Sequence, residues 1–345
     1  MSAFENNRQK GAILSFGELL LRICPDAAGE WLNENTLPFY VGGAELNVAT
    51  ALALWDLPSK YFTVLPANHM SAQIITHLQQ KNIDTGPVFF DGQRIGLYYL
   101  TKGKDLKHNA LIYDRAHSAF AGLEPGMVNW DVVLEDVSWF HFSAICPAVS
   151  QKSADVCLEV LQAASKKNIT ISVDLNYRAK LWQYGKTPQQ VMPQLAQYCN
   201  LIMGNIWAAE MMLGIPVKAD IHASAEKNTY LDAAQLTSQQ IMAQCPKCCA
   251  VANTFRFDDA DIINYYTALY TNHRLYESSQ YETTQIVDKV GSGDCFMAGL
   301  IYGFYNDMGP AETLEFATAA AFEKLFVQSD ATNKTVEEIK KAIKP

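Results

Sequence analysis

The feature that most constrains the fold is an alternation of short apolar runs with amphipathic segments along most of the chain. A run of about five apolar residues between turn residues predicts a buried strand, whereas apolar positions three and four residues apart predict a helix. Strands are predicted at 12–16, 60–64, 137–142, 170–173 and 201–203, and helices include 153–165 and 191–198. This order predicts βαβ units, and therefore a mostly parallel sheet with helices on both faces.

Two stretches, 18–40 and 88–116, interrupt this order because they are rich in strand-forming and turn residues and have little helical period. Residues 95–101 and 110–114 flank a polar segment and are typical of a β-hairpin. We interpret the two stretches as a small sheet that projects from the main domain, where it would form a lid over a ligand crevice. The alternative is an ordinary meander at the edge of the main sheet.

Charge and apolar patterning exclude several classes of protein. With 36 acidic and 27 basic residues, the formal net charge is -9, which argues against a protein that coats nucleic acid. It does not exclude binding of a phosphate, because a few local donors suffice. No apolar run is long enough to span a membrane and no signal peptide is evident, so we expect a cytoplasmic protein whose eight cysteines are reduced.

The segment 288–299, DKVGSGDCFMAG, carries the strongest chemical signal. A strand is predicted at 284–287 and a helix from about Gly293, so small residues occupy a strand-to-helix turn where backbone can approach a ligand closely. The N–H groups of a first helical turn attract an anion, and they would stabilise Asp294 as a carboxylate that can act as a base beside a bound phosphate. The alternative is a simple glycine turn in which Asp294 caps the helix. Spacing alone does not decide between the two.

A second motif makes the pattern more specific. Residues 42–49 read GGAELNVA, and together with 288–299 they resemble the two signatures of the PfkB (ribokinase-like) family of carbohydrate kinases, with Lys289 for Thr and Ser292 for Ala. Five further segments resemble the 2-keto-3-deoxygluconate kinase subgroup: 17–22, 96–99, 113–115, 139–143 and 174–178.

The resemblance implies a fold and a reaction. The fold would be one ribokinase-like α/β domain over residues 1–345, a three-layer sandwich whose lid comes from insertions at 18–40 and 88–116. The reaction would be transfer of the γ-phosphate of ATP to a primary hydroxyl, with 2-keto-3-deoxygluconate and its 6-phosphate as the favoured pair. Homodimerisation through the lid is expected, without nucleic acid or membrane partners.

The resemblance also assigns roles to residues. Asp294 would be the catalytic base, and the amides of Gly291, Ser292 and Gly293 would bind the transferred phosphoryl group. Mg²⁺ would accompany the nucleotide phosphates, and Asp288 would lie near a monovalent cation such as K⁺. The implied sugar contacts are Gly43, Asn47, Tyr98, Tyr113, Arg115 and Arg178. The implied nucleotide contacts are Asn176, Asn205, Thr254, Arg256, Gly291, Gly293 and Thr318.

Two arginines beside one crevice favour an acidic sugar, because a guanidinium binds a carboxylate bidentately. The alternatives are a solvated hairpin charge for Arg115 and an ion pair with Asp174 for Arg178.

The chain also departs from the family. Ala208 stands where the family often has a Glu that organises Mg²⁺, and Glu210 is about 200° further round a helix. A kinase of a neutral sugar such as fructose or ribose, and a non-catalytic sugar- or nucleotide-binding relative, therefore stay open. The position of Cys295 at a helix start could lower its thiol pKa, although no catalytic role is assigned to it.

Overall fold

A computed structural model describes residues 10–25, 31–32, 35–100, 111–218, 221, 226–259 and 262–344. Its main sheet has the strand order β14-β13-β12-β11-β10-β9-β1-β4, with β15 also paired to β13. The parallel strands are β1 (Ala12–Phe16), β4 (Ser59–Phe62), β9 (Val137–Ser143), β10 (Thr170–Asp174), β11 (Leu201–Gly204) and β12 (Ala250–Asp259). The antiparallel strands are β13 (Ile262–Thr271), β14 (Arg274–Glu277) and β15 (Tyr281–Thr283). The predicted mostly parallel sheet is confirmed.

Two predicted strands differ from the structure. The run at 60–64 is divided, because β4 ends at Phe62 and β5 (Val64–Leu65) pairs instead with β6 (Phe89–Phe90). The strand predicted at 284–287 is wrong, since β15 ends at Thr283. The N–H of Val287 donates to the carbonyl of Leu325 at 2.9 Å, so this segment is fixed by a helix end instead of a neighbouring strand.

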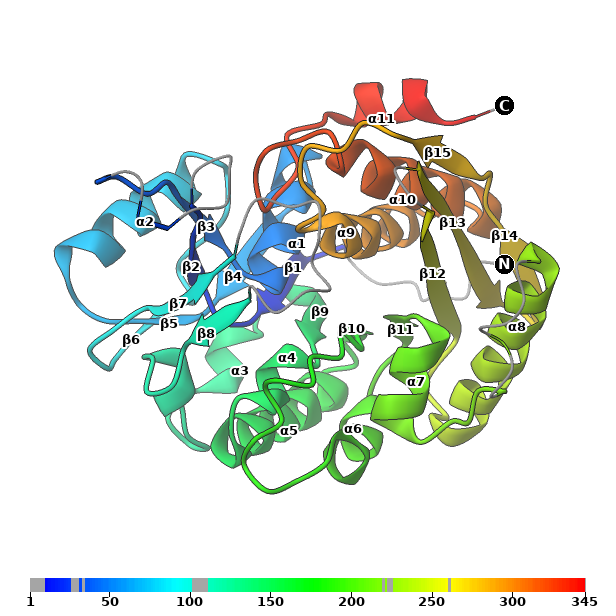
Figure 1. Cartoon of the computed structure of the whole chain (residues 1–345). Coiled ribbons are helices and arrows are strands. Elements are labelled where there is room, and N and C mark those ends of the chain that lie inside the picture. The colour runs from blue at the N-terminus through cyan, green and yellow to red at the C-terminus, as the bar shows by residue number, and fades with distance from the viewer. Residues whose placement is uncertain are drawn as a thin grey trace.

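Helices cover both faces of the main sheet (Figure 1). One face carries α1 (Ala44–Leu54), α9 (Ser292–Tyr305), α10 (Pro310–Lys324) and α11 (Val336–Ala342). The other face carries α3 (Trp130–Val133), α4 (Ile145–Ala148), α5 (Gln151–Lys166), α6 (Pro188–Ala196), α7 (Ile206–Leu213) and α8 (Lys227–Gln244). The helix α2 (His69–Gln79) packs near β4, and a short 3₁₀ helix spans Phe120–Gly122. Because helices cover both faces of the main sheet, its central strands are buried on both sides, which explains their continuous apolar sequences.

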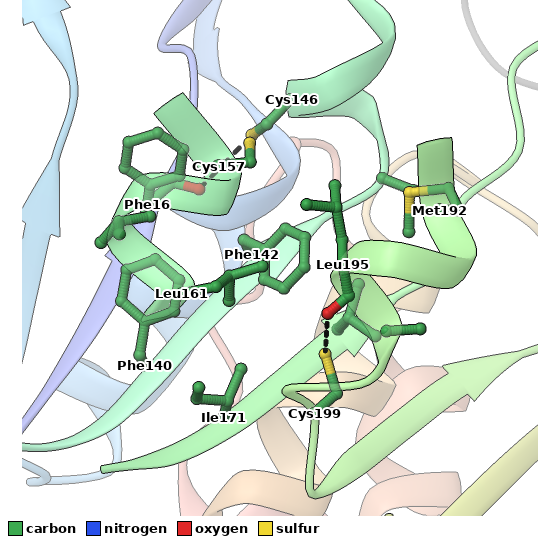
Figure 2. Packing of buried hydrophobic residues seen from close by; sticks show 14 of the residues in the cluster. Phe16, Phe140, Phe142, Cys146, Cys157, Leu161, Ile171, Met192, Leu195 and Cys199 are labelled. Carbon is green, nitrogen blue, oxygen red and sulfur yellow. Dashed lines mark hydrogen bonds between the residues drawn. The ribbon is translucent and has the colours of Figure 1, made fainter. Parts of the chain in front are cut away.

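The apolar residues of these strands and helices pack together in a buried core. In Figure 2, Phe16 of β1 and Phe140 and Phe142 of β9 lie against Leu161 of α5 and Leu195 of α6. Full burial of one such side chain contributes roughly 1.5–3 kcal/mol. The same core takes up three thiols, those of Cys146, Cys157 and Cys199, and all eight cysteines are free of disulfides.

A second sheet, called the small sheet below, has the strand order β3-β2-β7-β8. It consists of β2 (Leu20–Ile23), β3 (Phe39–Gly42), β7 (Gly96–Tyr99) and β8 (Ile112–Asp114). The two strands of the predicted hairpin, β7 and β8, pair antiparallel with Tyr98 opposite Tyr113. Residues 26–30, 33–34 and 101–110 of the two interrupting stretches lie outside the described residues. The small sheet stands beside one end of the main sheet (Figure 1).

No helix among the described residues combines the length and the apolar character needed to cross a membrane.

Candidate active site

A cavity of about 830 Å³ is lined by residues of the main sheet, of the N-terminal turns of α1, α4, α7 and α9, and of the small sheet. Asp174 is the last residue of β10 and Asn205 directly follows β11, so the cavity lies at the carboxyl ends of parallel strands. This edge is where open α/β sheets bind ligands. Tyr98 and Tyr113 line the cavity from the small sheet. The topology therefore brings together residues from both motifs and from both interrupting stretches.

The start of α9 supplies backbone donors to this cavity. Gly291 precedes the helix with φ 77°, and a Cβ there would lie 1.7 Å from the carbonyl oxygen of Asp330, so only glycine fits. The amide of Cys295 is the one that donates back to Gly291, at 2.9 Å, and the preceding amides of a first helical turn have no partner within the helix. Ser292 contributes only backbone here, because its hydroxyl donates to the carbonyl of Ala321 at 2.9 Å.

Asp294 also lines the cavity, and the side-chain amide of Asn47 donates to its Oδ2 at 2.7 Å. Burial raises the pKa of Asp294 to about 7, and the carboxylates of Asp174 and Glu45 add to the rise, while the Asn47 hydrogen bond opposes it. Burial therefore outweighs the hydrogen bond from Asn47, and the pKa of Asp294 is not held below its ordinary value as the sequence analysis expected. A pKa near neutrality nevertheless suits a group that must accept a proton.

Two further carboxyl groups in the cavity were missed by the sequence analysis. Burial raises the pKa of Asp174 to about 7, although the backbone N–H of Asn176 donates to its Oδ1 at 3.0 Å. Glu45 is buried in the first turn of α1, where it accepts from the backbone N–H of Ser143 at 3.0 Å, and burial raises its pKa. The sequence could have indicated both residues, because Asp174 ends a predicted strand and Glu45 lies inside the first motif.

The two predicted sugar-binding arginines have different surroundings. Arg115 is buried, and its Nε donates to Glu18 Oε2 at 2.7 Å, so it is not a solvated hairpin charge. Arg178 is exposed at the rim, and its Nη1 donates to the carbonyl of Tyr177 at 3.1 Å. Over the part of the chain that the structure describes, Arg178 forms no ion pair with Asp174. Of the two predicted sugar-binding arginines, Arg178 is therefore the exposed one, and its charge opposes the raised pKa of the cavity carboxyls Asp174 and Asp294.

The other predicted sugar contacts lie close together. Gly43 caps α1 with φ 135°, and a Cβ there would approach the carbonyl oxygen of Glu18 to 2.4 Å. The hydroxyl of Tyr98 donates to Asp330 Oδ2 at 2.5 Å. The ring of Tyr113 lies 5.9 Å from the guanidinium of Arg115. All of these residues except Asp330 line the cavity.

Some of the predicted nucleotide contacts line the cavity, and one does not. Asn176, Asn205, Thr254 and Arg256 line the cavity, and the Oδ1 of Asn205 also caps α7 by accepting from the N–H of Ala208 at 2.7 Å. Thr318 does not line the cavity. It is fully buried in α10, and its hydroxyl lies 2.6 Å from that of Thr267. The prediction for Thr318 is corrected, because the hydroxyl serves helix-to-sheet packing.

Lys289 was not predicted to act, yet it lines the same cavity with its Nζ 3.1 Å from Asp258 Oδ2. The sequence could have indicated this residue, because Lys289 stands where the family signature has threonine.

The surroundings of Asp288 do not support the predicted monovalent cation there. Asp288 accepts from Arg22 Nη2 at 2.8 Å and from the N–H of Val290 at 3.0 Å, so its oxygens are occupied by protein donors. The residues present do not fit a monovalent cation at Asp288. Glu210 does not replace the carboxylate missing at Ala208, since its Oε1 accepts from the N–H of Val217 at 3.2 Å. Among the described residues, no three His, Cys, Asp or Glu side chains are grouped to hold a metal ion.

Cys295 is a buried structural thiol. Burial raises its pKa to about 12, which is opposite to the lowered value that a helix start would give, and its sulfur donates to the carbonyl of Ala320 at 3.2 Å.

Comparisons with known proteins agree with this geometry. Residues 11–252 and 262–338 match the pfkB family carbohydrate kinases. A solved 2-dehydro-3-deoxygluconokinase from Thermotoga maritima is 31% identical, with a TM-score of 0.86 over 96% of this chain and 98% of that chain. A 2-dehydro-3-deoxygalactonokinase from Haloferax volcanii is 26% identical over 96% of each chain. A fructokinase from Xylella fastidiosa, solved with bound ATP, is 18% identical with a TM-score of 0.76 over 97% of this chain and 98% of that chain, and it shares the ribokinase-like fold. The chain is therefore a member of the PfkB family of carbohydrate kinases.

Proposed function

We propose that this sugar kinase uses ATP to phosphorylate a primary hydroxyl of an acidic keto-deoxy sugar, with 2-keto-3-deoxygluconate and its 6-phosphate as the favoured substrate and product. The observation that carries the proposal is one cavity that joins Asp294, at the start of α9, to the exposed guanidinium of Arg178. A carboxyl near the anion-binding backbone and a cation at the rim match the two ends of such a substrate. The names of the relatives from Thermotoga maritima and Haloferax volcanii support the same substrate class.

In the proposed reaction, the ionised Asp294 takes the proton of the sugar hydroxyl as the hydroxyl oxygen bonds to the γ-phosphorus of ATP. The bond between that phosphorus and the β,γ-bridging oxygen breaks, and ADP leaves. The amides at Gly291, Ser292 and Gly293 stabilise the charge on the phosphoryl oxygens. The side-chain amide of Asn47 orients Asp294, which it contacts at 2.7 Å. The carboxylate of the sugar binds Arg178.

The nucleotide would contact Asn176, Asn205, Thr254 and Arg256, which line the same cavity with Lys289. Because the described residues contain no cluster of three potential ligands, Mg²⁺ would be held mainly by the phosphates and water, as this ion commonly is. When bound with the nucleotide, it would neutralise phosphate charge.

We also propose that the small sheet acts as a lid and joins two chains in a homodimer. Phe39 of β3 and Ile112 of β8 are 53% and 56% exposed on its outer strands, and such apolar side chains favour a partner surface. Sedimentation velocity should give a dimer for the wild type and a monomer for Ile112→Glu. A dimer in both would contradict this arrangement. The eight free thiols agree with a reducing compartment such as the cytoplasm.

The substrate proposal is tested by ATP consumption with a panel of 2-keto-3-deoxygluconate, 2-keto-3-deoxygalactonate, fructose and ribose. We expect the highest kcat/KM with a keto-deoxy acid, and a higher value with fructose or ribose would reassign the substrate. Asp294→Asn should lower kcat by about 10²–10⁴-fold, because it removes the base, while sugar binding measured by calorimetry persists. Sugar binding without turnover in the wild type would instead support a non-catalytic relative.

A further inference from the structure

Asp330 lies outside both motifs, in the segment that follows α10, and its side chain is fully buried. Arg22 of β2 donates from Nε to its Oδ1 at 2.7 Å, and the hydroxyl of Tyr98 of β7 donates to its Oδ2 at 2.5 Å. Both donors belong to the small sheet. The carboxylate of Asp330 is therefore held by two strands that come much earlier in the chain.

The same residue packs against a glycine of each motif. A Cβ on Gly42, the first residue of the motif at 42–49, would lie 2.3 Å from Asp330 Oδ2. A Cβ on Gly291 would lie 1.7 Å from the carbonyl oxygen of Asp330. The backbone of both motifs thus lies directly against Asp330. Because protein interiors are close-packed, a shift of this residue is transmitted to the turn that precedes α9.

Arg22 also reaches the other side of that turn. Its Nη2 donates to Asp288 Oδ2 at 2.8 Å, and Asp288 Oδ1 accepts from the N–H of Val290 at 3.0 Å. The guanidinium lies 4.4 Å from the ring of Tyr40 on β3. A planar guanidinium holds its partners in a fixed geometry. The anion-binding turn is therefore flanked by Asp288 and Asp330, and one buried side chain of the small sheet contacts both.

Tyr98 connects these contacts to the ligand cavity. Its side chain lines the cavity, while its hydroxyl donates to Asp330. A sugar that packs against Tyr98 would therefore act on the same carboxylate that packs against the motif backbone. The rate of a bound reaction is sensitive to such positioning, since a misplacement of about 1 Å can cost about 10²-fold.

We propose that Asp330 is a positioning residue of this kinase. Held by Arg22 and Tyr98, it sets the place of Gly291 and of the amides that follow, so that the small sheet controls the rate of phosphoryl transfer. The inference rests on the proposed function, because it takes this turn to bind the transferred phosphoryl group. It does not depend on the identity of the sugar.

The kinetic test replaces the carboxylate. Asp330→Asn keeps the size of the side chain but leaves one acceptor oxygen for two donors. With the sugar that the wild type phosphorylates fastest, kcat should fall about 10–10²-fold, while KM for ATP and KM for the sugar stay unchanged. Tyr98→Phe removes one donor and should lower kcat less, again without raising KM for the sugar.

The matched control is Arg94→Lys, which alters another arginine of the same region. Arg94 lies 2.8 Å from Asp114 of β8 and does not line the cavity, so its replacement should leave kcat at the wild-type value. A merely structural role of Asp330 would lower the melting temperature of Asp330→Asn and leave kcat of the folded enzyme unchanged. That result would overturn the proposal.

A double variant tests whether the two contacts act as one unit. Asp330→Asn combined with Tyr98→Phe should lower kcat by less than the product of the two single losses, because both changes affect the same hydrogen bond. Losses that multiply in full would show that Tyr98 acts on the sugar separately and would contradict the proposal.

A measurement without substrate separates this inference from the proposed function. Hydrogen exchange followed by mass spectrometry should be faster at residues 289–294 in Asp330→Asn and in Tyr98→Phe than in the wild type, with exchange in α5 unchanged. Unchanged exchange at the turn in the folded variants would overturn the inference, whereas a wild type that phosphorylates no sugar would reject only the proposed function. If Asp330→Asn does not fold, Tyr98→Phe decides, because it leaves the carboxylate and Arg22 in place.

Discussion

At the scale of single residues, the site combines groups whose ordinary behaviour is changed by burial. Asp174 and Asp294 both have a pKa raised to about 7, mainly by burial. Arg115 is satisfied by Glu18, whereas Arg178 stays exposed at the rim. The two arginines thus differ: Arg115 is paired inside the protein, and Arg178 is exposed at the cavity.

Removal of the Asn47 amide should change the pH dependence of the reaction. The amide donates to Asp294 and lowers its pKa against the effect of burial, so Asn47→Ala should raise that pKa. The acid limb of the profile of kcat/KM against pH, which reports the free enzyme, should move to higher pH. An unchanged midpoint, whatever happens to KM, would show that Asp294 is not the group that titrates.

Loss of the Arg178 charge should affect acidic sugars selectively. A hydrogen bond to a charged group is worth about 1.5–3 kcal/mol, so Arg178→Gln should raise KM for the keto-deoxy acid about 10–100-fold. A neutral sugar should change little. The matched control is Lys180→Gln, which removes an exposed charge two residues away that does not line the cavity. Equal losses on acidic and neutral sugars would argue against carboxylate recognition.

At the scale of elements, the N-termini of α1 and α9 bring the two motifs together. Gly43 and Gly291, the residues before these helices, both have positive φ and both would clash with backbone oxygen if they carried a Cβ. The path of the chain therefore requires glycine at both positions.

Two glycines of α9 should respond differently to alanine. Gly291→Ala should destabilise the protein by at least about 1–3 kcal/mol, because the positive φ and the carbonyl of Asp330 both oppose a Cβ. Gly293 is helical and meets nothing within 4 Å, so Gly293→Ala should be neutral or stabilise by about 0.5–1 kcal/mol. It should nevertheless lower kcat, since its Cβ enters the cavity at the anion-binding turn. Urea unfolding and steady-state rates separate the two effects, and equal stability losses would contradict this assignment.

At the scale of the whole molecule, the cavity lowers stability at neutral and alkaline pH. Asp174 has a folded pKa of about 7 against a reference value of 3.8, so the folded state binds the proton more tightly. Its contribution to stability is fully present below the unfolded pKa and is lost as pH rises through about 7.

Asp174→Asn should therefore stabilise the protein relative to the wild type at pH values above 7, and this advantage should shrink as pH falls from about 7 toward the reference value. Melting temperatures across this range give the measurement, with Asp131→Asn as an exposed control that should show no such trend. A constant difference between Asp174→Asn and the wild type at all pH values would contradict the raised pKa.

The succession of strands and helices along the chain, the two motifs and about half of the residues that line the cavity could be predicted from the amino-acid sequence. These follow from local pattern, because apolar period, glycine turns and residue types at strand ends act over a few residues. Asp294 could be predicted in this way, whereas Asn47 and Arg178 were predicted from the resemblance to the PfkB family.

The pairing of charges and the burial of polar groups could be seen only in the folded chain. The contacts of Arg22 with Asp288 and Asp330 join residues 266 and 308 positions apart. Thr318, predicted to contact the nucleotide, instead lies against Thr267. The pKa of Asp294 depends on burial by the whole fold, which outweighs the hydrogen bond that it accepts from Asn47. Burial and long-range pairing are properties of the packed chain, so no local pattern in the sequence determines them.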